Sequence, residues 1–429
     1  MPENCKAVTS TNIGANLVGD LWLPRYGSWS EKIFNLRMED VQSRFECPDE
    51  VIEQSSVFGE RKFAEWEGRT PLEPAGYLFL VPLRLTRSSS RYMSELSCFL
   101  PVLEYLDSAT AQVLASSLPP FAGCLTNGRN GLRGAIWCTQ VYSDMAFDLG
   151  GLSGAIKTSR SIVDSVVARA SKSSDLRIVG LGAALPSITK FGTALNTEVP
   201  TTTGHGCTVA LMVRMVIDTL HSTSTQSPRP ERLGVLGLGS IGLATAVALI
   251  ESCEVSELVV YDVNEKAVGR LLRMNQTMSS PVRVMVASDE KELIESCSVL
   301  ASAITSQLDL EKLRADVADL VIIDDSQPGA FDAGQVHAGG GRLQWVVGMD
   351  HTADLAFTRP NEVRYGTEGL ASISDVWGCE AEAGALALLN REGAALDRPV
   401  SSSDVANFSN LLSDAEIGIA PPQAFGKRL

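Results

Sequence analysis

The chain has 429 residues, of which 45% are apolar and 20% are charged. This balance is typical of a globular protein and excludes a wholly disordered chain. The 36 basic and 51 acidic side chains leave a net charge of −15, which argues against a general binder of nucleic acid or of anionic membranes.

The beginning of the chain lacks a secretory signal pattern, and no run of about 18 apolar residues could cross a bilayer. We therefore expect a cytoplasmic protein without an integral membrane segment. No pair of the nine cysteines is spaced C-x-x-C, and the four histidines form no metal-binding pattern. We expect neither a metal site nor a disulfide framework.

Strands and helices alternate irregularly in the first half of the chain. The patterns predict strands at 77–85 and 176–181, turns at 118–131, a loop entering a helix at 97–106, an amphipathic helix at 154–172, and a Thr/Gly-rich loop with an apolar helix at 200–220. The polar face of the helix at 154–172 carries Lys157, Arg160, Arg169 and Lys172. This face is either solvated or a docking patch for an acidic partner.

The pattern changes after residue 231 to a regular alternation of strands and helices, which predicts a parallel sheet covered on both faces. Predicted strands lie at 233–238, 257–262, 282–287, 299–303, 320–325 and 343–348, with helices at 241–252, 265–274, 289–296 and 309–314. A last apolar helix is predicted at 374–389, and a short amphipathic piece at 405–412.

We therefore expect an α/β fold that consists of a Rossmann-type doubly wound parallel sheet and a second α/β substrate domain. The Rossmann domain is predicted at 221–364. Residues 1–220 form the substrate and catalytic domain, onto which the segment 365–429 packs back.

The strongest motif is Gly237-Leu-Gly239-Ser240-Ile241-Gly242, which follows a predicted buried strand and opens a predicted helix. In this context the first glycine permits a tight turn, the second lets the backbone approach a pyrophosphate, and the third allows close packing of helix and strand. The helix N-terminus offers free N–H groups to the phosphates.

Asp262 ends the second strand of this unit, 20 residues after Gly242. An acidic side chain there binds ribose hydroxyls and repels a 2′-phosphate, which favours NADH over NADPH. The alternative is that Asp262 caps the following helix. Thr305 and Ser306, just after the fourth strand, lie where such folds line the nicotinamide.

Cys379 is the candidate nucleophile. If Ser374 caps the last helix, Cys379 lies in its second turn, where the helix dipole favours the thiolate. Such a thiolate can take an acyl group from a thioester, and hydride can then reduce the acyl group to an aldehyde. Glu382, three residues on, lies on the same helix face and could orient the group or relay a proton. The alternative is a buried structural cysteine.

Several segments resemble the long-chain acyl-(acyl-carrier-protein) reductases, which make fatty aldehydes from acyl thioesters. They are SCFLP at 97–101, LGAALPS at 181–187, TTG at 202–204 followed by Thr208, the glycine motif, IDD at 323–325 and GCEAEA at 378–383. The resemblance spans about 92–392 and implies that Cys379 carries the acyl group. It also implies NADPH, although the basic residue that follows the family's second strand is absent here.

The sequence therefore predicts an NAD(P)H-dependent reductase of acyl thioesters carried by acyl carrier protein or coenzyme A. We assign Thr202 and Thr203 to the cofactor side of the site. The 202–205 loop is expected to supply oxyanion donors, and His205 to act as general acid. The alternatives are a non-covalent dehydrogenase of the shikimate dehydrogenase or ornithine cyclodeaminase type, and a non-catalytic NAD-binding regulatory protein. The sequence leaves open whether the protein forms a homo-oligomer.

Overall fold

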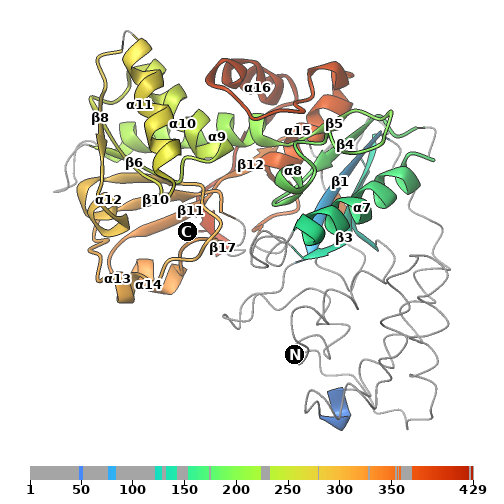
Figure 1. Ribbon diagram of the computed structural model, residues 1–429, viewed down its shortest axis with the longest axis horizontal. Helices are drawn as coiled ribbons and strands as arrows, with labels where there is room; N and C mark the ends of the chain where they lie inside the picture. Colours follow the sequence, from blue (N-terminus) through green and yellow to red (C-terminus); the bar gives the residue numbers. More distant parts are fainter. Residues whose placement is uncertain are drawn as a thin grey trace.

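The structure is a computed structural model, which describes residues 48–51, 76–83, 121–127, 132–142, 153–172, 175–223, 232–278, 280–326, 329–352, 355, 357–358, 370–424 and 427–428. Two six-stranded sheets form the centres of two α/β units, and helices lie against both of them (Figure 1). The predicted loop and helix at 97–106 lie outside the described residues.

The first of these sheets contains six parallel strands in the order β11-β10-β9-β6-β7-β8. Their bounds are β6 Leu233–Leu236, β7 Glu257–Tyr261, β8 Arg283–Val286, β9 Val299–Ser302, β10 Val321–Asp324 and β11 Arg342–Trp345. Counted along the chain from β6, the order is 3-2-1-4-5-6, which is that of a doubly wound dinucleotide-binding sheet. The predicted α/β Rossmann-type fold is confirmed.

The helices of this unit follow from capping and from apolar composition. They are α10 Ser240–Ser252, α11 Glu265–Thr277, α12 Glu290–Ser296, α13 Leu310–Leu313 and α14 Ala333–Ala338. In α11 to α14 an Asn or Asp side chain at the N-cap accepts a hydrogen bond from the first turn, which satisfies a backbone donor that the helix leaves free. Helix α14 was not predicted from the sequence.

The second sheet has the order β13-β2-β3-β1-β4-β5. Its strands are β1 Gly76–Leu83, β2 Phe121–Asn127, β3 Arg133–Tyr142, β4 Ile178–Leu181, β5 Thr201–Thr202 and β13 Phe357–Thr358. The prediction of turns at 118–131 is wrong for β2. This strand pairs antiparallel with both β3 and β13, and such pairing satisfies its backbone despite the turn-forming residues around it.

Two helices cover one face of the second sheet. Helix α7, Ser153–Ala170, buries Val163, Val166 and Val167 in one apolar cluster with Leu78 and Leu80 of β1. The short helix α8, Leu185–Ile188, joins the same cluster. The apolar spacing read from the sequence is therefore the buried stripe of α7.

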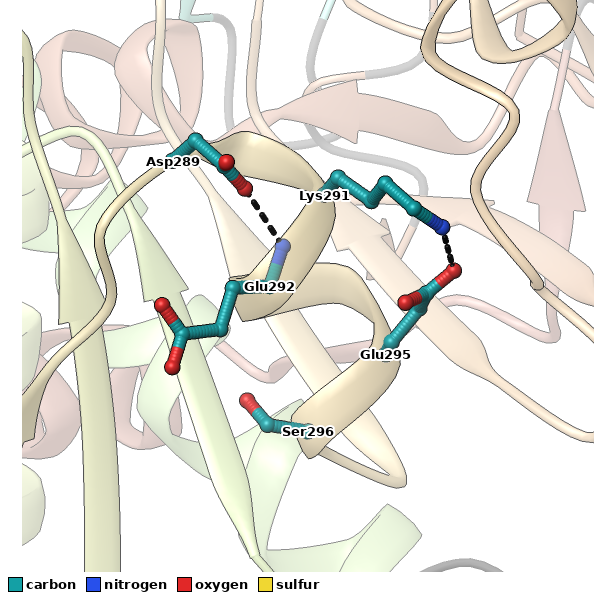
Figure 2. Close-up of a pocket in the computed structure, with 5 residues that line it drawn as sticks. All are labelled: Asp289, Lys291, Glu292, Glu295 and Ser296. Atoms are coloured by element: carbon teal, nitrogen blue, oxygen red, sulfur yellow. Dashed lines mark hydrogen bonds and ion pairs between the residues drawn. The ribbon is translucent and has the colours of Figure 1, made fainter.

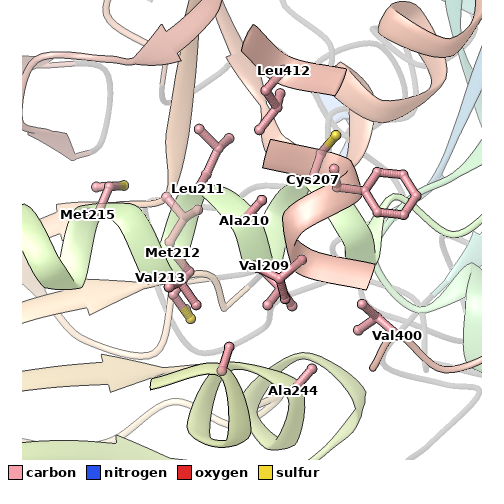
Figure 3. Close-up of a cluster of buried hydrophobic side chains, with 14 of the residues drawn as sticks. Cys207, Val209, Ala210, Leu211, Met212, Val213, Met215, Ala244, Val400 and Leu412 are labelled. Atoms are coloured by element: carbon pink, nitrogen blue, oxygen red, sulfur yellow. The ribbon is translucent and has the colours of Figure 1, made fainter. Parts of the chain in front are cut away.

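Helix α9, His205–Thr223, connects the two units. It is apolar on most of its surface and lies among buried side chains of α10 and of the C-terminal helix α16, Ser402–Asp414 (Figure 3). Helix α15, Gly378–Leu388, packs against α9 and against β1 and β4 of the second sheet. The C-terminal segment thus returns to the first half of the chain (Figure 1).

Two predicted elements are divided in the structure. The strand predicted at 343–348 is β11 followed by β12, Val347–Asp350, which belongs to a separate antiparallel sheet with β14, Asp375–Trp377, and β15, Ile417–Ile419. The start of the helix predicted at 374–389 is therefore strand β14. Pairing with distant strands decides both points, and no local pattern carries that information.

The remaining elements are the 3₁₀ turn η4, Glu392–Ala394, and the hairpin of β16, Gln423–Ala424, and β17, Lys427–Arg428. Over the described part of the chain, no helix has both the length and the apolar character needed to cross a bilayer.

Candidate functional site

The three glycines of the motif have the different geometries that a dinucleotide loop requires. Gly237 has a φ of +86°, and a Cβ there would lie 2.6 Å from the carbonyl oxygen of Ala303. A Cβ on Gly242 would lie 1.9 Å from the carbonyl oxygen of Gly237. A Cβ on Gly239 would meet no atom within 4 Å, so open space lies above this residue. A pyrophosphate fits such a cradle.

Helix α10 starts directly behind this space. Its N-cap is Gly239, and no side chain caps its first turn, so the N–H groups of the first turn have no side-chain acceptor. Ser240 and Ile241 follow in that turn; Ile241 packs on the core and Ser240 is half-buried. The site therefore fits the phosphates of a dinucleotide.

Asp262 lies immediately beyond β7 and connects two loops. Its carboxylate accepts hydrogen bonds from the backbone N–H of Leu238, in the glycine loop, and of Asn264 at 2.7 Å. The N-cap of α11 is Asn264, so Asp262 does not cap that helix. The next residue, Val263, is 82% exposed. The carboxylate is thus held at the rim of the glycine loop, where a ribose would lie in this fold.

Cys379 lies in the first turn of α15, and not in the second as predicted. The N-cap is Trp377, and Ser374 precedes strand β14. The Cys379 side chain is partly exposed. Gly204 contacts it closely, because a Cβ on Gly204 would lie 2.3 Å from the Cα of Cys379 and the φ of Gly204 is +72°. Only glycine fits there without a shift of the backbone.

The surroundings of the Cys379 thiol oppose its ionisation. Burial raises its pKa well above the ordinary value, and the negative charges of Asp325 and Glu380 raise it further. The backbone N–H groups of Cys379 and Glu380 at the start of α15 act in the opposite direction without offsetting these effects. The helix N-terminus therefore acts in the predicted direction but is outweighed, so the thiol is favoured over the thiolate in the free protein.

Glu382 is a buried acceptor for the start of helix α9. Its carboxylate accepts hydrogen bonds from the Thr202 hydroxyl, from Gly204 N at 3.2 Å and from Cys207 N at 2.9 Å. Burial raises the pKa of Glu382, and these hydrogen bonds oppose the rise. Glu382 therefore joins α15 to the 202–207 segment and holds its orientation. Both carboxylate oxygens are occupied by these hydrogen bonds, so neither is free for a proton relay.

Thr202 and Thr203 are not available to a cofactor. Both are fully buried. The hydroxyl of Thr202 donates to Glu382 and accepts from Leu396 N at 3.2 Å, and that of Thr203 accepts from His205 N at 3.3 Å. The N–H groups of Thr203, Gly204 and His205 are bound within the protein as well, so the predicted oxyanion donors are not free at 203–205. These hydroxyl and N–H groups hold the 202–205 loop in place.

His205 links the glycine loop to the cysteine. Its Nδ1 lies 3.1 Å from the hydroxyl of Ser240, while the preceding residue, Gly204, lies against Cys379. Phe191 packs edge-on against the imidazole at 6.2 Å between ring centroids. Burial lowers the pKa of His205 to about 4, so the imidazole is neutral at pH 7 and carries no acidic imidazolium proton.

Sequence reasoning missed two acidic residues beside Cys379. Asp325, directly after β10, had been noted only within a family motif, and Glu380 only as the neighbour of Cys379. Their charges act on the thiol. An Asp at the carboxyl end of a parallel strand was the available signal. Thr305 and Ser306 are exposed after β9 and stay predicted nicotinamide contacts.

A surface hollow on α12 carries no comparable chemistry. Asp289, Lys291, Glu292, Glu295 and Ser296 line it. Figure 2 shows the contacts of Asp289 with the backbone N–H of Glu292 and of Lys291 with Glu295, and the remaining polar groups bind neighbouring residues. In the part of the chain described here, no three His, Cys, Asp or Glu side chains are grouped to hold a metal ion.

We predict that Glu382→Gln lowers the free energy of unfolding by about 2–4 kcal/mol, because the amide nitrogen cannot accept from the N–H of Cys207 and leaves it unsatisfied. Chemical denaturation monitored by circular dichroism measures this change. Glu311→Gln, an exposed residue of α13, is the matched control and should change stability by less than about 0.5 kcal/mol. Unchanged stability with lost activity would instead indicate a proton relay.

No protein-family model and no curated protein matches the sequence. Among solved structures, the chain is similar to an NAD-dependent malic enzyme from Thermotoga maritima, with 12% identity, a TM-score of 0.34 and coverage of 90% of this chain and 94% of that one. It is also similar to L-tryptophan dehydrogenase from Nostoc punctiforme, with 11% identity, a TM-score of 0.30 and coverage of 80% of this chain and 90% of that one.

An imine reductase from Aspergillus terreus has 16% identity and a TM-score of 0.22 over 30% of this chain. This chain covers 44% of that reductase, which is less than half of its length. The assignment to the class of Rossmann-type α/β proteins rests on the strand order and the glycine loop. At these identities and TM-scores the matches add nothing about substrate.

Proposed function

We propose that this protein is an NAD(P)H-dependent oxidoreductase that reduces an acyl thioester to an aldehyde through an acyl group on Cys379. One observation carries the proposal. Two consecutive residues connect the dinucleotide loop with the cysteine, because Gly204 packs on Cys379 and His205 contacts Ser240. A nucleophile and a hydride donor need such proximity to act on one carbonyl carbon.

The reaction begins with attack of the Cys379 sulfur on the thioester carbonyl. The thiol proton leaves to a base, the C–S bond of the substrate breaks, and the carrier thiol departs with a proton. The neutral imidazole of His205 suits this exchange, since it accepts a proton and returns it. It therefore acts first as a base, and not as the predicted acid.

A bound reduced nicotinamide supplies the hydride for the second half of the reaction. The acyl carbon on Cys379 gains this hydride, and its oxygen gains a proton. Breaking of the C–S bond then releases the aldehyde and regenerates the thiol. Because the Cys379 thiol has a raised pKa, its sulfur is a poor leaving group as a thiolate, and it takes up the proton of the adjacent hydroxyl as the C–S bond breaks.

A panel of acyl thioesters on pantetheine, coenzyme A and acyl carrier protein tests the proposal. We expect aldehyde with NADH or NADPH. Without either nucleotide, intact-protein mass spectrometry should detect one acyl group, and peptide mapping should locate it at Cys379. Absence of both aldehyde and adduct across the panel would reject the proposal.

The raised pKa of the Cys379 thiol favours a second candidate, a non-covalent NAD(P)-dependent dehydrogenase. Such an enzyme would turn over a small substrate and form no adduct at Cys379. The same mass measurement separates the two candidates.

We predict that NADH is preferred to NADPH, because a 2′-phosphate beside Asp262 would bring like charges together and Val263 offers no cation. The cost is on the order of a hundredfold in affinity. The double variant Asp262→Ala/Val263→Arg should move the ratio of dissociation constants toward NADPH, as measured by nucleotide fluorescence. Arg270→Ala is the control and should leave the ratio of dissociation constants unchanged. Tighter binding of NADPH by the unmodified protein would contradict the prediction.

We predict that an acidic carrier protein docks on α7 and the turn that follows it, where Lys157 and Lys172 are exposed. Arg160 is excluded from this surface, because its Nε donates to the Ile188 carbonyl at 3.0 Å, and the Arg169 side chain lies outside the described residues. Lys157→Glu/Lys172→Glu should raise KM for carrier-bound acyl groups several-fold at low salt, and less at high salt.

Pantetheine thioesters should be unaffected by the α7 substitutions. The pair Lys312→Glu/Arg342→Glu makes the same charge change at exposed positions of the Rossmann unit and serves as control. Equal effects of the two pairs on KM would remove α7 as the docking surface.

A further inference from the structure

His205 is fixed both at its ring and at its backbone. Its Nδ1 lies 3.1 Å from the hydroxyl oxygen of Ser240, and Phe191 lies edge-on to the ring at an interplanar angle of 86°. The N–H groups of Gly204 and Cys207, on either side of it in the chain, donate to a buried carboxylate of α15 at 3.2 and 2.9 Å. The imidazole therefore has one defined orientation, with Nδ1 toward the dinucleotide loop.

The turn that carries Phe191 is itself held in a rare backbone conformation. Lys190, Phe191 and Gly192 have φ values of +53°, +60° and +90°. Residues other than glycine keep such angles only where their surroundings fix them. Here the Thr189 hydroxyl donates to the Leu185 carbonyl at 2.7 Å and accepts from the N–H of Gly192 at 3.1 Å. The turn thus holds Phe191 against the imidazole and opposes rotation of the ring.

Nε2 is the nitrogen of His205 that is left for chemistry at Cys379. Nδ1 is bound to Ser240, whereas Nε2 has no hydrogen-bond partner in the described part of the chain. The preceding residue, Gly204, packs on the Cα of Cys379. A neutral imidazole has its proton on one ring nitrogen and a lone pair on the other. Nε2 can therefore accept the thiol proton only in the tautomer that has its proton on Nδ1.

Ser240 decides between the two tautomers of His205. Its hydroxyl has one proton and can either donate to Nδ1 or accept from it. When the hydroxyl donates, the imidazole proton is on Nε2, and no ring nitrogen is a base toward the thiol. When the hydroxyl accepts, the imidazole proton is on Nδ1 and Nε2 is free. The hydrogen bond at one ring nitrogen thus sets the chemistry of the other.

The same hydroxyl lies at the predicted nucleotide site. Ser240 is the first residue of α10 and follows Gly239, above which space is open. A phosphate oxygen in this space accepts hydrogen bonds and donates none. If the hydroxyl of Ser240 turns its proton to such an oxygen, it keeps only a lone pair for His205 and has to accept from Nδ1–H.

We propose that Ser240 couples nucleotide binding to the reactivity of Cys379 by selecting the Nδ1–H tautomer of His205. Ser240 is a positioning residue here, and the inference rests on the proposed function for the identity of the reaction. With the nucleotide site filled, Nε2 accepts the thiol proton as the sulfur attacks the thioester. With the site empty, only a fraction of His205 is in the competent tautomer, so acylation is slower. The acyl group therefore forms mainly where a reductant is already bound.

The first test reads the tautomer directly in the full chain. The four histidines are labelled with ¹⁵N, and the ring nitrogens are followed by two-dimensional NMR during titration with ADP-ribose, which has the pyrophosphate but no nicotinamide. The variant His205→Gln assigns the signals. We expect the Nδ1–H population of His205 to rise to saturation, and Ser240→Ala to abolish this response. An unchanged tautomer population in the unmodified protein overturns the inference.

The second test measures alkylation of Cys379 by iodoacetamide, in which the sulfur displaces iodide and the thiol proton leaves to His205. Saturating ADP-ribose should raise this rate about fivefold or more relative to its effect at exposed Cys253, as measured by peptide mass spectrometry. Ser240→Ala should lose the response, and Ser240→Thr, which keeps a hydroxyl, should retain it. Ser252→Ala makes the same change at the exposed end of α10 and is the control.

Calorimetric titration shows that each variant is saturated with ADP-ribose, and melting curves show that it is folded. The backbone N–H groups at the start of α10 are unchanged in Ser240→Ala, so this variant should still bind ADP-ribose. A full response of Ser240→Ala, in the alkylation rate or in the tautomer, overturns the inference.

A third measurement separates this inference from the proposed function. The rate at which acyl pantetheine acylates Cys379 is compared with and without ADP-ribose, and aldehyde formation is followed with reduced nucleotide. Aldehyde formation together with an acylation rate that does not depend on ADP-ribose overturns the coupling while the proposed function stands. Alkylation that depends on ADP-ribose, with no acylation and no reduction of any thioester, supports the coupling and rejects the proposed function.

Discussion

Replacement of Cys379 by alanine is expected to lower the rate of aldehyde formation by about 10⁴-fold or more, because removal of a covalent nucleophile leaves no route to the acyl intermediate. Alanine retains the Cβ on which Gly204 packs, so the contact between α15 and the 204–205 turn is preserved. The dissociation constant of the nucleotide should therefore stay within about twofold of the original value, since Cys379 lies outside the glycine loop.

The measurement combines steady-state aldehyde formation with nucleotide titration by fluorescence. Cys253→Ala is the matched control, since this cysteine is exposed at the end of α10 and should be dispensable. Cys379→Ser adds a second comparison, because a hydroxyl keeps the shape but is a far weaker nucleophile. Near-normal turnover in Cys379→Ala would refute the covalent mechanism and favour the non-covalent dehydrogenase.

Replacement of Gly239 by valine is expected to raise the dissociation constant of the nucleotide by at least about a hundredfold, because the branched side chain occupies the space that the pyrophosphate needs. The structure makes this substitution a clean test. No atom lies within 4 Å of a Cβ placed on Gly239, whereas one on Gly242 would lie 1.9 Å from a backbone oxygen. The variant should fold, and its melting temperature should change little.

Gly393→Val provides the control, because a Cβ at this exposed position of η4 also meets no atom within 4 Å. It introduces the same side chain far from the glycine loop in sequence and should bind nucleotide normally. Unchanged nucleotide affinity in Gly239→Val would show that the glycine loop does not hold a dinucleotide, and it would reject the redox function with it.

Local sequence was sufficient for most of the Rossmann unit, apart from α14 and the end of β11. Most strands there are short apolar runs, most of its helices start at an Asn or Asp cap, and the glycine motif lies between β6 and α10. These signals depend on residues close together in the chain, so they can be recognised without knowledge of the tertiary structure. The individual roles of Gly237, Gly239 and Gly242 followed from the same local reasoning.

The second unit depended on pairing between distant segments. Strand β2 was taken for turns because of the Pro, Gly and Asn residues around it. Its partner β3 follows it directly in the chain, whereas its other partner, β13, lies more than 200 residues away. The break between β11 and β12 has the same origin, since β12 pairs with β14 and β15 in another sheet. Long-range pairing overrides local propensity in such strands.

The sequence by itself determined the fold class, the glycine loop and Cys379 as the cysteine to examine. Only the tertiary structure decided what surrounds that cysteine. It made Glu382 the hydrogen-bond acceptor for the start of α9, lowered the pKa of His205 through burial, and surrounded the Cys379 thiol with groups that oppose its ionisation. The physical reason is that burial and charge are properties of packed neighbours, and those neighbours come from elements far apart in the chain.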